Sequence, residues 1–357
     1  MIVRFLQAGN GDSIILSFND ANQNRNIIID SGVSATYYNP SSNTFGPLKD
    51  EIDRIKQNNE FIDLLILTHI DNDHICGFLT WFENDKSAFK LIKKIWFNSS
   101  NLIAEHFEKP ENEDLQVKLN IFNSAQTGIK EAIVFEKYLE KFELLNKNVI
   151  IEKQKFEENN LKIEILSPTE TQLEKLLREY RKIDSSGKTK GKRKDWDIDL
   201  KDFIKEEEEK TFKFKEDDKV KNGSSISFIL TYNSLKMLFL ADSHPSGVIK
   251  ELRRLGYSED NPLNINLMKI SHHGSKANTN KELLQIVKTN DYILSTDSSG
   301  NYHPNKRTIA RIINSNRDAI FHFNYEHVRN EIFTKNDKKD FKIVAKVTNE
   351  LKYEHEA

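Results

Sequence analysis

Four residues with metal-binding side chains lie within six positions of one another. They are His69, Asp71, Asp73 and His74, in the segment T-H-I-D-N-D-H-I-C-G. This segment follows directly on an apolar run, 61–67, which is typical of a buried strand. Gathering imidazoles and carboxylates at the end of such a strand is costly unless a cation neutralises the charge. The pattern therefore predicts a metal site, against the alternative of a solvated polar loop.

Further polar residues follow other apolar runs. Asp30 follows I-I-I, Asp242 follows F-L-A, His272 and His273 follow L-M-K-I-S, and residues 301–304 come shortly after I-L-S-T. Ligand sites in α/β folds lie at the carboxyl ends of strands, so these segments can converge. A pair of divalent cations bridged by a carboxylate would activate water for attack on an ester and neutralise phosphoryl charge. The sequence contains no G-x-S-x-G motif that would supply a serine nucleophile instead.

The elements that would position these residues follow the order of an α/β fold. In the first hundred residues, strands are predicted at 2–7, 13–18, 26–30, 61–67 and 94–98, and helices at 48–58 and 77–86. A mainly helical stretch is predicted over 99–160, then a strand at 161–166 and a hairpin of 225–232 with 235–240. Later strands are predicted at 265–270, 292–295 and 319–323, and helices at 246–255, 281–288 and 306–314. Strands that alternate with helices predict sheets covered by helices.

Residues 170–220 differ in composition from their surroundings. They contain the acidic run 206–209 and a basic run set among Ser and Gly, which consists of Lys188, Lys190, Lys192, Arg193 and Lys194. This pattern indicates a charged insertion of helices around a mobile loop. The basic run could contact phosphate groups, or the insertion could bind a protein partner.

The composition of the chain bears on nucleic-acid binding, on cysteine-based sites and on location. Of 357 residues, 37% are hydrophobic and 30% charged, and the net charge of −2 gives no general case for nucleic-acid binding. The one cysteine, Cys76, excludes an internal disulfide and a cysteine-based zinc site. The N-terminus lacks the apolar run of a signal peptide, and no segment reaches the roughly 18 apolar residues of a membrane span. A cytoplasmic protein that does not enter a membrane is expected.

The motifs resemble, in collinear order, those of the metallo-β-lactamase fold superfamily, and within it the hydrolase domain of the competence protein ComEC and its soluble relatives. The matching segments are residues 2–16, I-I-I-D-S-G, T-H-I-D-N-D-H-I-C-G, N-G-S-S-I-S-F-I-L, F-L-A-D, I-S-H-H-G-S and N-Y-H-P. The resemblance implies an α/β fold, a metallo-β-lactamase-like αββα sandwich. It would form a single hydrolase domain over 1–357, with a helical elaboration at 99–160 and the charged insertion at 170–220.

The resemblance also implies two divalent metal ions. Its implied ligands are His69 and Asp71 for one ion, Asp73 and His74 for the other, Asp242 as the bridge, and one histidine of the pair His272/His273. His272 is the expected ligand because it is closer to the strand end. Asp73, His273 and His303 are the expected catalytic residues, with His303 as a phosphate contact or proton donor.

Four further residues are expected to contact substrate, namely Ser275, Lys276, Asn301 and Tyr302. Asp30 is expected to orient the ligand loop through hydrogen bonds. Asp12 is expected either to hold a tight turn beside the site or to be an ordinary turn residue.

Two departures from the superfamily pattern affect the metals. Asp71 stands where a second histidine is usual, as in the ComEC group, so the oxygen-rich site makes Mn²⁺ a rival to Zn²⁺. The usual histidine in the middle of the domain has no clear counterpart. Between His74 and Asp242 the only histidine is His106, which reads as an exposed helical position. The second metal site is therefore the less secure of the two.

The leading expectation is a phosphodiesterase, and most specifically a DNA nuclease, because ComEC-like domains are associated with DNA hydrolysis. One alternative is hydrolysis of a small phosphodiester such as a cyclic nucleotide or a phosphocholine-type ester. Another is a regulatory protein without catalysis, in which the metal site is vestigial and the insertion binds a partner.

Overall fold

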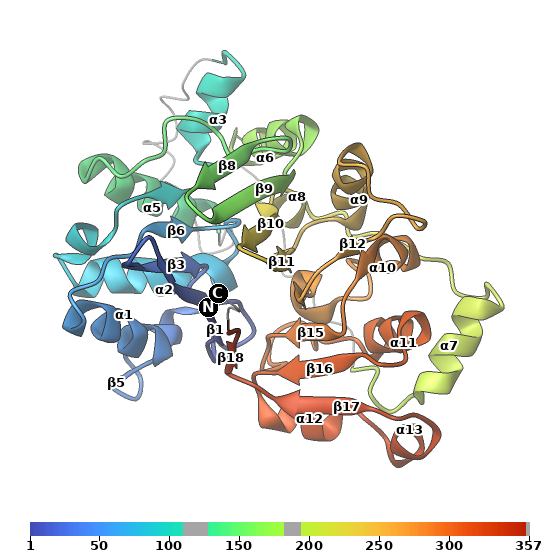
Figure 1. Ribbon diagram of the computed structural model, residues 1–357. Helices are drawn as coiled ribbons and strands as arrows, with labels where there is room; N and C mark the ends of the chain where they lie inside the picture. Colours follow the sequence, from blue (N-terminus) through green and yellow to red (C-terminus); the bar gives the residue numbers. More distant parts are fainter. Residues whose placement is uncertain (110–127, 182–193, 355–357) are drawn as a thin grey trace. The chain divides into compact units, whose positions relative to one another are not determined.

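The computed structural model describes residues 1–109, 128–181 and 194–354, which form two compact units (Figure 1). The first unit contains Met1–Ile151, Pro168–Lys190 and Glu350–Ala357, and the second contains Glu152–Ser167 and Gly191–Asn349. Of the basic run, only Lys194 falls within the described residues. Phosphate contacts by the rest of that run stay a prediction.

A six-stranded sheet forms the centre of the first unit. Its strands, in spatial order, are β18 (Glu350–Lys352), β1 (Ile2–Phe5), β2 (Ile14–Asp20), β3 (Gln23–Ile29), β6 (Leu64–Ile66) and β7 (Ile95–Trp96). The strands from β18 to β3 are antiparallel, whereas β3, β6 and β7 are parallel. A short hairpin, β4 (Tyr38–Asn39) with β5 (Thr44–Phe45), lies in the segment after β3.

The helices of the first unit are α1 (Pro47–Gln57), α2 (Asn72–Asn84), α3 (Ser100–His106), α5 (Ile129–Lys141) and α6 (Glu170–Arg181). Phe78 and Phe82 of α2 stack on Phe135 of α5, with ring centroids 6.1 and 5.6 Å apart. The predicted start of a helix at Gly77 is wrong, because α2 begins at Asn72. Asp71 has an extended backbone at the N-cap position, and the carboxylate of Asp73 in the first turn suits the positive end of the helix dipole.

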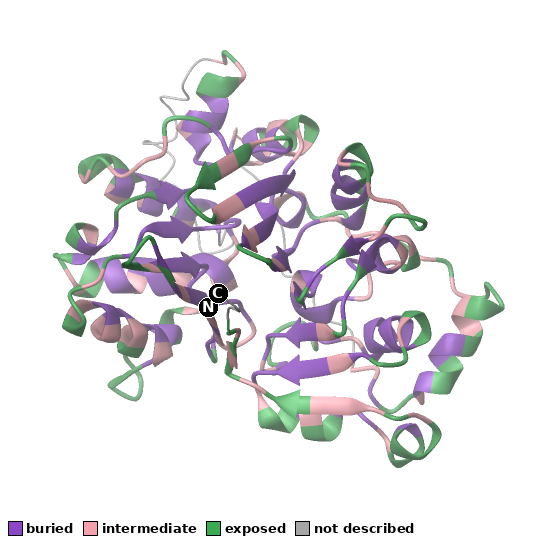
Figure 2. Ribbon diagram, viewed as in Figure 1, coloured by how far each residue is buried: buried purple, intermediate pink, exposed green. Residues whose placement is uncertain are grey.

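The second unit contains an eight-stranded sheet. Its strands, in spatial order, are β17 (Val344–Val347), β16 (Ile320–Phe323), β15 (Asp291–Leu294), β13 (Leu267–Lys269), β11 (Leu235–Phe239), β10 (Ser227–Tyr232), β9 (Leu161–Ser167) and β8 (Lys155–Glu158). The strands from β8 to β11 are antiparallel, and those from β11 to β17 are parallel. The central strands are buried, whereas the edge strands β8 and β17 are partly exposed (Figure 2).

The other elements of the second unit are α7 (Leu200–Glu208), α8 (Val220–Gly223), α9 (Pro245–Arg254), α10 (Lys281–Ile286), α11 (Lys306–Ser315), α12 (Glu326–Glu331), α13 (Lys335–Asp340) and the strand pair β12 (Leu263–Asn264) with β14 (Val287–Lys288). Buried apolar side chains of the sheet and of α11 form one core, which includes Leu238, Met268, Phe321 and Ile309. Burying such a side chain contributes about 1.5–3 kcal/mol, so this core is the main source of the unit's stability.

The α/β class is confirmed. The predicted mainly helical stretch 99–160 contains α3 and α5, and near its end β8 pairs antiparallel with β9. Residues 110–127 of that stretch lie outside the described residues. Among the helices of the described ranges, none combines the length and the apolar character that crossing a membrane would require.

Candidate metal centre

In the first unit, two parallel neighbouring strands bring their carboxyl ends together. Asp30 follows β3, and Thr68 and His69 follow β6, which is the parallel neighbour of β3. The backbone N–H of Asp30 donates to the carbonyl of Ile66 at 2.9 Å, so the register of the strands continues into the site. The strand pairing alone thus explains why residues nearly forty positions apart meet.

The Asp30 carboxylate organises the loop that follows β6. Its Oδ1 accepts the backbone N–H of Thr68 at 2.8 Å. Its Oδ2 accepts the Thr68 hydroxyl at 2.7 Å and the Nδ1–H of His74 at 2.8 Å. Asp30 is 1% exposed, so these bonds are shielded from water. The arrangement matches the orienting role expected for Asp30.

These bonds also determine which nitrogen of each imidazole carries the proton. A carboxylate only accepts, so the proton of His74 is on Nδ1. The Thr68 hydroxyl gives its one proton to Asp30 and therefore accepts from Nδ1 of His69, at 3.1 Å. Both histidines are left with a lone pair on Nε2, which is the form that binds a metal. Their ring centroids are 4.1 Å apart.

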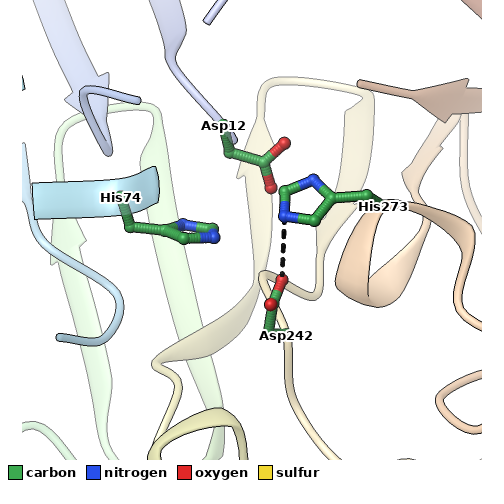
Figure 3. A group of neighbouring side chains, drawn as sticks. All are labelled: Asp12, His74, Asp242 and His273. Carbon is green, nitrogen blue, oxygen red and sulfur yellow. Dashed lines mark ion pairs between the residues drawn. The ribbon is translucent and has the colours of Figure 1, made fainter. Parts of the chain in front are cut away.

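The turn before β2 packs against the first turn of α2. Asn10 Nδ2 donates to Oδ2 of Asp73 at 2.6 Å, and the N–H of Asp12 donates to the Asp73 carbonyl at 3.3 Å. A Cβ on Gly11 would lie 1.8 Å from that carbonyl oxygen, so only glycine permits this approach. An Asp12 carboxylate oxygen and a ring nitrogen of His74 lie within 4.8 Å (Figure 3). Asn10 was not predicted as a site residue.

In the second unit, three adjacent parallel strands end at candidate residues. Asp242 comes shortly after β11, the histidine pair after β13, and Ser295 directly after β15. His273 donates its Nδ1–H to the carbonyl of Ser295 at 2.8 Å, which leaves the lone pair on Nε2. That Nε2 lies 3.7 Å from Oδ1 of Asp242, and both side chains are buried (Figure 3).

His272 has a different environment from its neighbour. Its Nδ1 lies 3.1 Å from Oδ1 of Asn278 and 3.3 Å from Oδ2 of Asp217, and its Nε2 lies 3.5 Å from Oδ2 of Asp242. Burial lowers the pKa of His272, but the charges of Asp242 and Asp217 outweigh it and raise that pKa to about 9. Although burial opposes it, the hydrogen bond and charge of His272 hold the pKa of Asp217 well below its usual value.

His303 stacks edge-on against His272, with ring centroids 4.8 Å apart. Desolvation and the positive charge of His272 lower the pKa of His303 well below its usual value. A neutral His303 can donate one hydrogen bond. Two nearby residues that are expected to contact substrate, Asn301 and Tyr302, are exposed.

The two remaining expected substrate residues belong to the turn after the histidine pair. Ser275 is buried, and its hydroxyl oxygen accepts the backbone N–H of Ala277 at 3.2 Å. Lys276 is half-buried, and its backbone N–H donates to Oδ1 of Asn305 at 2.9 Å.

Several non-glycine residues at these strand ends have a left-handed backbone. They are Asp30, Ala241, His272, His273 and Tyr302, with φ between 46° and 57°. Such a conformation costs roughly 1–3 kcal/mol per residue and persists only where the surroundings enforce it. Its repetition at the strand ends that carry the candidate residues is typical of a functional site.

The donor chemistry within each unit suits a divalent cation. The first unit offers Nε2 of His69 and His74 and the carboxylates of Asp71 and Asp73, and the second offers Asp242 with His273. His106, at the end of α3, instead pairs with Glu170 at 2.9 Å and is exposed, as the sequence predicted. Neutral imidazoles and carboxylates are the ligand types of Zn²⁺ and Mn²⁺.

Replacing Asp30 by asparagine should weaken metal binding by roughly 10–100-fold. Asparagine tolerates the left-handed backbone, but its amide N–H₂ would face Nδ1 of His74 and force the ring proton onto Nε2. Competition titration of Zn²⁺ against a chromophoric chelator measures the change. Asp50→Asn, an exposed carboxylate on α1, is the matched control, and equal affinity in the two variants would refute the orienting role.

A known protein family matches a large part of the first unit. Residues 8–143 match the profile of the family described as the metallo-beta-lactamase superfamily. This span covers the strands and helices from β2 to α5 and contains Asp12, Asp30 and the His69–His74 ligand segment. A search of curated protein sequences found no match.

Several solved structures are similar to this chain at low identity. The isothiocyanate hydrolase from Delia radicum gut bacteria is 12% identical over 99% of each chain, with a TM-score of 0.38. A metallo-beta-lactamase from Cronobacter sakazakii is 9% identical over 74% of this chain and 73% of its own, with a TM-score of 0.32. CmlA, a diiron beta-hydroxylase from Streptomyces venezuelae, is 9% identical over 98% of this chain and 53% of its own, with a TM-score of 0.40. These similarities carry no conclusion about activity.

Proposed function

This chain belongs to the metallo-β-lactamase superfamily, and we propose that it is a metal-dependent phosphodiesterase that cleaves DNA. Membership of this superfamily of metallohydrolases supports an enzyme. The observation that carries the proposal is the state of His69, His74 and His273. Each holds its proton on Nδ1 through a fixed acceptor and presents Nε2 as a metal ligand.

The proposed ligands of two divalent ions, Zn²⁺ or Mn²⁺, are His69, Asp71, Asp73, His74, Asp242 and His273. His273 replaces the sequence-based choice of His272 because it is 3% exposed and is fixed by a backbone carbonyl. His272 then becomes the histidine proposed to act on the substrate, together with His303. Asp73 keeps both proposed roles, as a ligand and in catalysis, while Asn10 holds its carboxylate in place.

When bound, the ions would supply Lewis acidity for activating water and neutralise charge that develops on the phosphoryl oxygens. The chain's own residues would do the rest. The Nε2 of His272 would donate a hydrogen bond to a phosphoryl oxygen, and His303 would add a second. Tyr302, which is exposed beside His303, would stack on a nucleobase.

The donor set favours a phosphodiester over a β-lactam. Carboxylates make up half of the proposed ligands, and Asp71 stands where the superfamily usually has a histidine. Oxygen-rich sites favour the hard cations, such as Mn²⁺, that assist phosphoryl transfer. A nuclease follows from the resemblance of the same motifs to the ComEC-type hydrolase domain.

Incubation of the purified protein with DNA tests this proposal. Single-stranded and double-stranded DNA, RNA and bis(p-nitrophenyl) phosphate should each be tried with Mn²⁺ and with Zn²⁺, with chelator-treated protein as the control. We expect metal-dependent cleavage of DNA. Cleavage of bis(p-nitrophenyl) phosphate without cleavage of nucleic acid would point to a small phosphodiester substrate. The absence of metal-dependent cleavage of every substrate would refute the phosphodiesterase.

A further inference from the structure

The charged insertion ends in a segment that is fastened to α11. This segment, residues 206–217, is called the strap here. Glu206 forms an ion pair with Arg307, and Oε1 of Glu207 lies 2.8 Å from Nε of Arg311. The guanidinium carbon of Arg307 lies 3.8 Å from the ring centre of Phe212. These ion pairs and cation–π contacts involve two buried arginines. They hold the first half of the strap in one position on α11.

The second half of the strap alternates between inward and outward side chains. Phe214 packs under Arg311 with 5.2 Å between the guanidinium carbon and the ring centre, whereas Lys213 and Lys215 are exposed. Glu216 then accepts the backbone N–H and the hydroxyl of Ser246, both at 2.8 Å, at the start of α9. These contacts fix the position of the next residue, Asp217.

Asp217 lies at the centre of a polar cluster. Its Oδ2 accepts from Nδ2 of Asn222 at 2.7 Å and from Nδ2 of Asn278 at 3.1 Å, and it lies 3.3 Å from Nδ1 of His272. Its Oδ1 accepts the N–H of Lys219 at 3.0 Å. The Asp217 side chain is 8% exposed. A carboxylate that is buried with this many donors is held in one orientation.

Asn278 couples this carboxylate to the residues around Asp242. Its Oδ1 accepts from Nδ1 of His272 at 3.1 Å, and its Nδ2 donates both to Asp217 and to the carbonyl of Asp242. Arg311 fastens the same turn by donating to the carbonyls of Lys276 and Thr279, at 2.6 and 2.8 Å. One arginine of α11 thus holds both the strap and the turn that carries Asn278.

We propose that Asp217 is a positioning residue, supplied by the charged insertion, that turns Nδ1 of His272 towards the strap and Nε2 towards Asp242. Without Asp217, Nδ1 keeps the side-chain amides of Asn278 and Asn222, at 3.1 and 3.3 Å, but has no carboxylate to hold it, so the ring can rotate about its side-chain bonds. The consequence for hydrolysis rests on the proposed function of His272, whereas the orientation of the ring does not. This assigns the insertion a role in the site.

The orientation can be tested by NMR on the whole chain labelled with ¹⁵N-histidine. The ring signals of His272 are assigned by their loss in His272→Gln. In Asp217→Ala these signals should shift, and in Asp217→Asn, which keeps an acceptor oxygen, they should shift less. The ring signals of His322, which is held by Asp291 and Thr348, should stay unchanged in both variants. Asp218→Asn, the exposed neighbouring carboxylate, should leave every ring signal unchanged.

Unchanged His272 signals in folded Asp217→Ala would overturn the proposal, and if that variant does not fold, unchanged signals in Asp217→Asn would do so. With an active enzyme, Asp217→Ala should lower kcat by roughly 10–100-fold while metal content stays at the wild-type level. If the wild-type protein cleaves no phosphodiester but the ring signals still shift, the proposed function fails and the positioning role stands.

Discussion

The double variant Asp73→Ala/His74→Ala is expected to lose bound metal and to lower phosphodiester hydrolysis by at least about 10²–10³-fold, the range seen when one electrostatic stabiliser is removed. The physical reason is that His74 is the one imidazole fixed directly by the Asp30 carboxylate, and Asp73 is the carboxylate held by Asn10. Elemental analysis of the purified protein measures the metal, and initial rates on DNA measure the activity.

A matched control for this variant changes the same residue types elsewhere in the first unit. Asp50→Ala/His106→Ala removes an exposed aspartate of α1 and the exposed histidine of α3 that pairs with Glu170. It should keep the wild-type metal content and rate. Wild-type metal content in Asp73→Ala/His74→Ala, with a normal circular dichroism spectrum, would show that the metal binds elsewhere.

The largest loss of stability is expected from Lys306→Met in the second unit. Lys306 and Asp337 form an ion pair with both side chains fully buried. Lys306 Nζ also donates to the carbonyl of Trp196 at 3.0 Å, and Asp337 accepts the N–H of Leu200 at 2.6 Å. Removing the lysine leaves the aspartate as an uncompensated buried charge, which costs about 3–5 kcal/mol of the free energy of unfolding.

Urea denaturation followed by circular dichroism measures this loss. Lys201→Met is the matched control, because Lys201 pairs with Asp340 at 3.4 Å on the surface of the same region, where both side chains are at least one-third exposed. An exposed pair contributes only about 0–1 kcal/mol. Equal unfolding free energies for the two variants would contradict the importance of the buried pair.

The sequence predicted where the strands next to the site end, because polar candidate residues follow apolar runs at those positions. Asp30, His69 and Asp242 each stand after an apolar run that proves to be a buried strand, and parallel pairing then brings each close to its neighbours. Apolar runs bounded by polar residues are a strong local signal. The α/β class and the hydrogen bonds from Asp30 to the ligand loop could be predicted for that reason.

Other features had no local signal. The start of α2 was misplaced because ligand residues indicate a loop, although Asp73 and His74 also fit the first turn of a helix. Asp217 was missed because its partner, His272, lies 55 positions away and the charged composition of the insertion suggests mobility. Asn10 was missed because an asparagine beside glycines is usually an ordinary turn residue. Contacts between distant segments decide these cases, and composition does not report them.

The pairing of β18 with β1 has a consequence for synthesis on the ribosome. β18 follows β17 of the second unit, yet it aligns with β1 so that Ile2 is opposite Lys352. β1 is made long before β18 and therefore has an open edge until residues 350–352 have been made. An unpaired edge is a template for aggregation. We expect a chain truncated after residue 349 to aggregate during expression, and nascent chains of that length to depend on chaperones for their solubility.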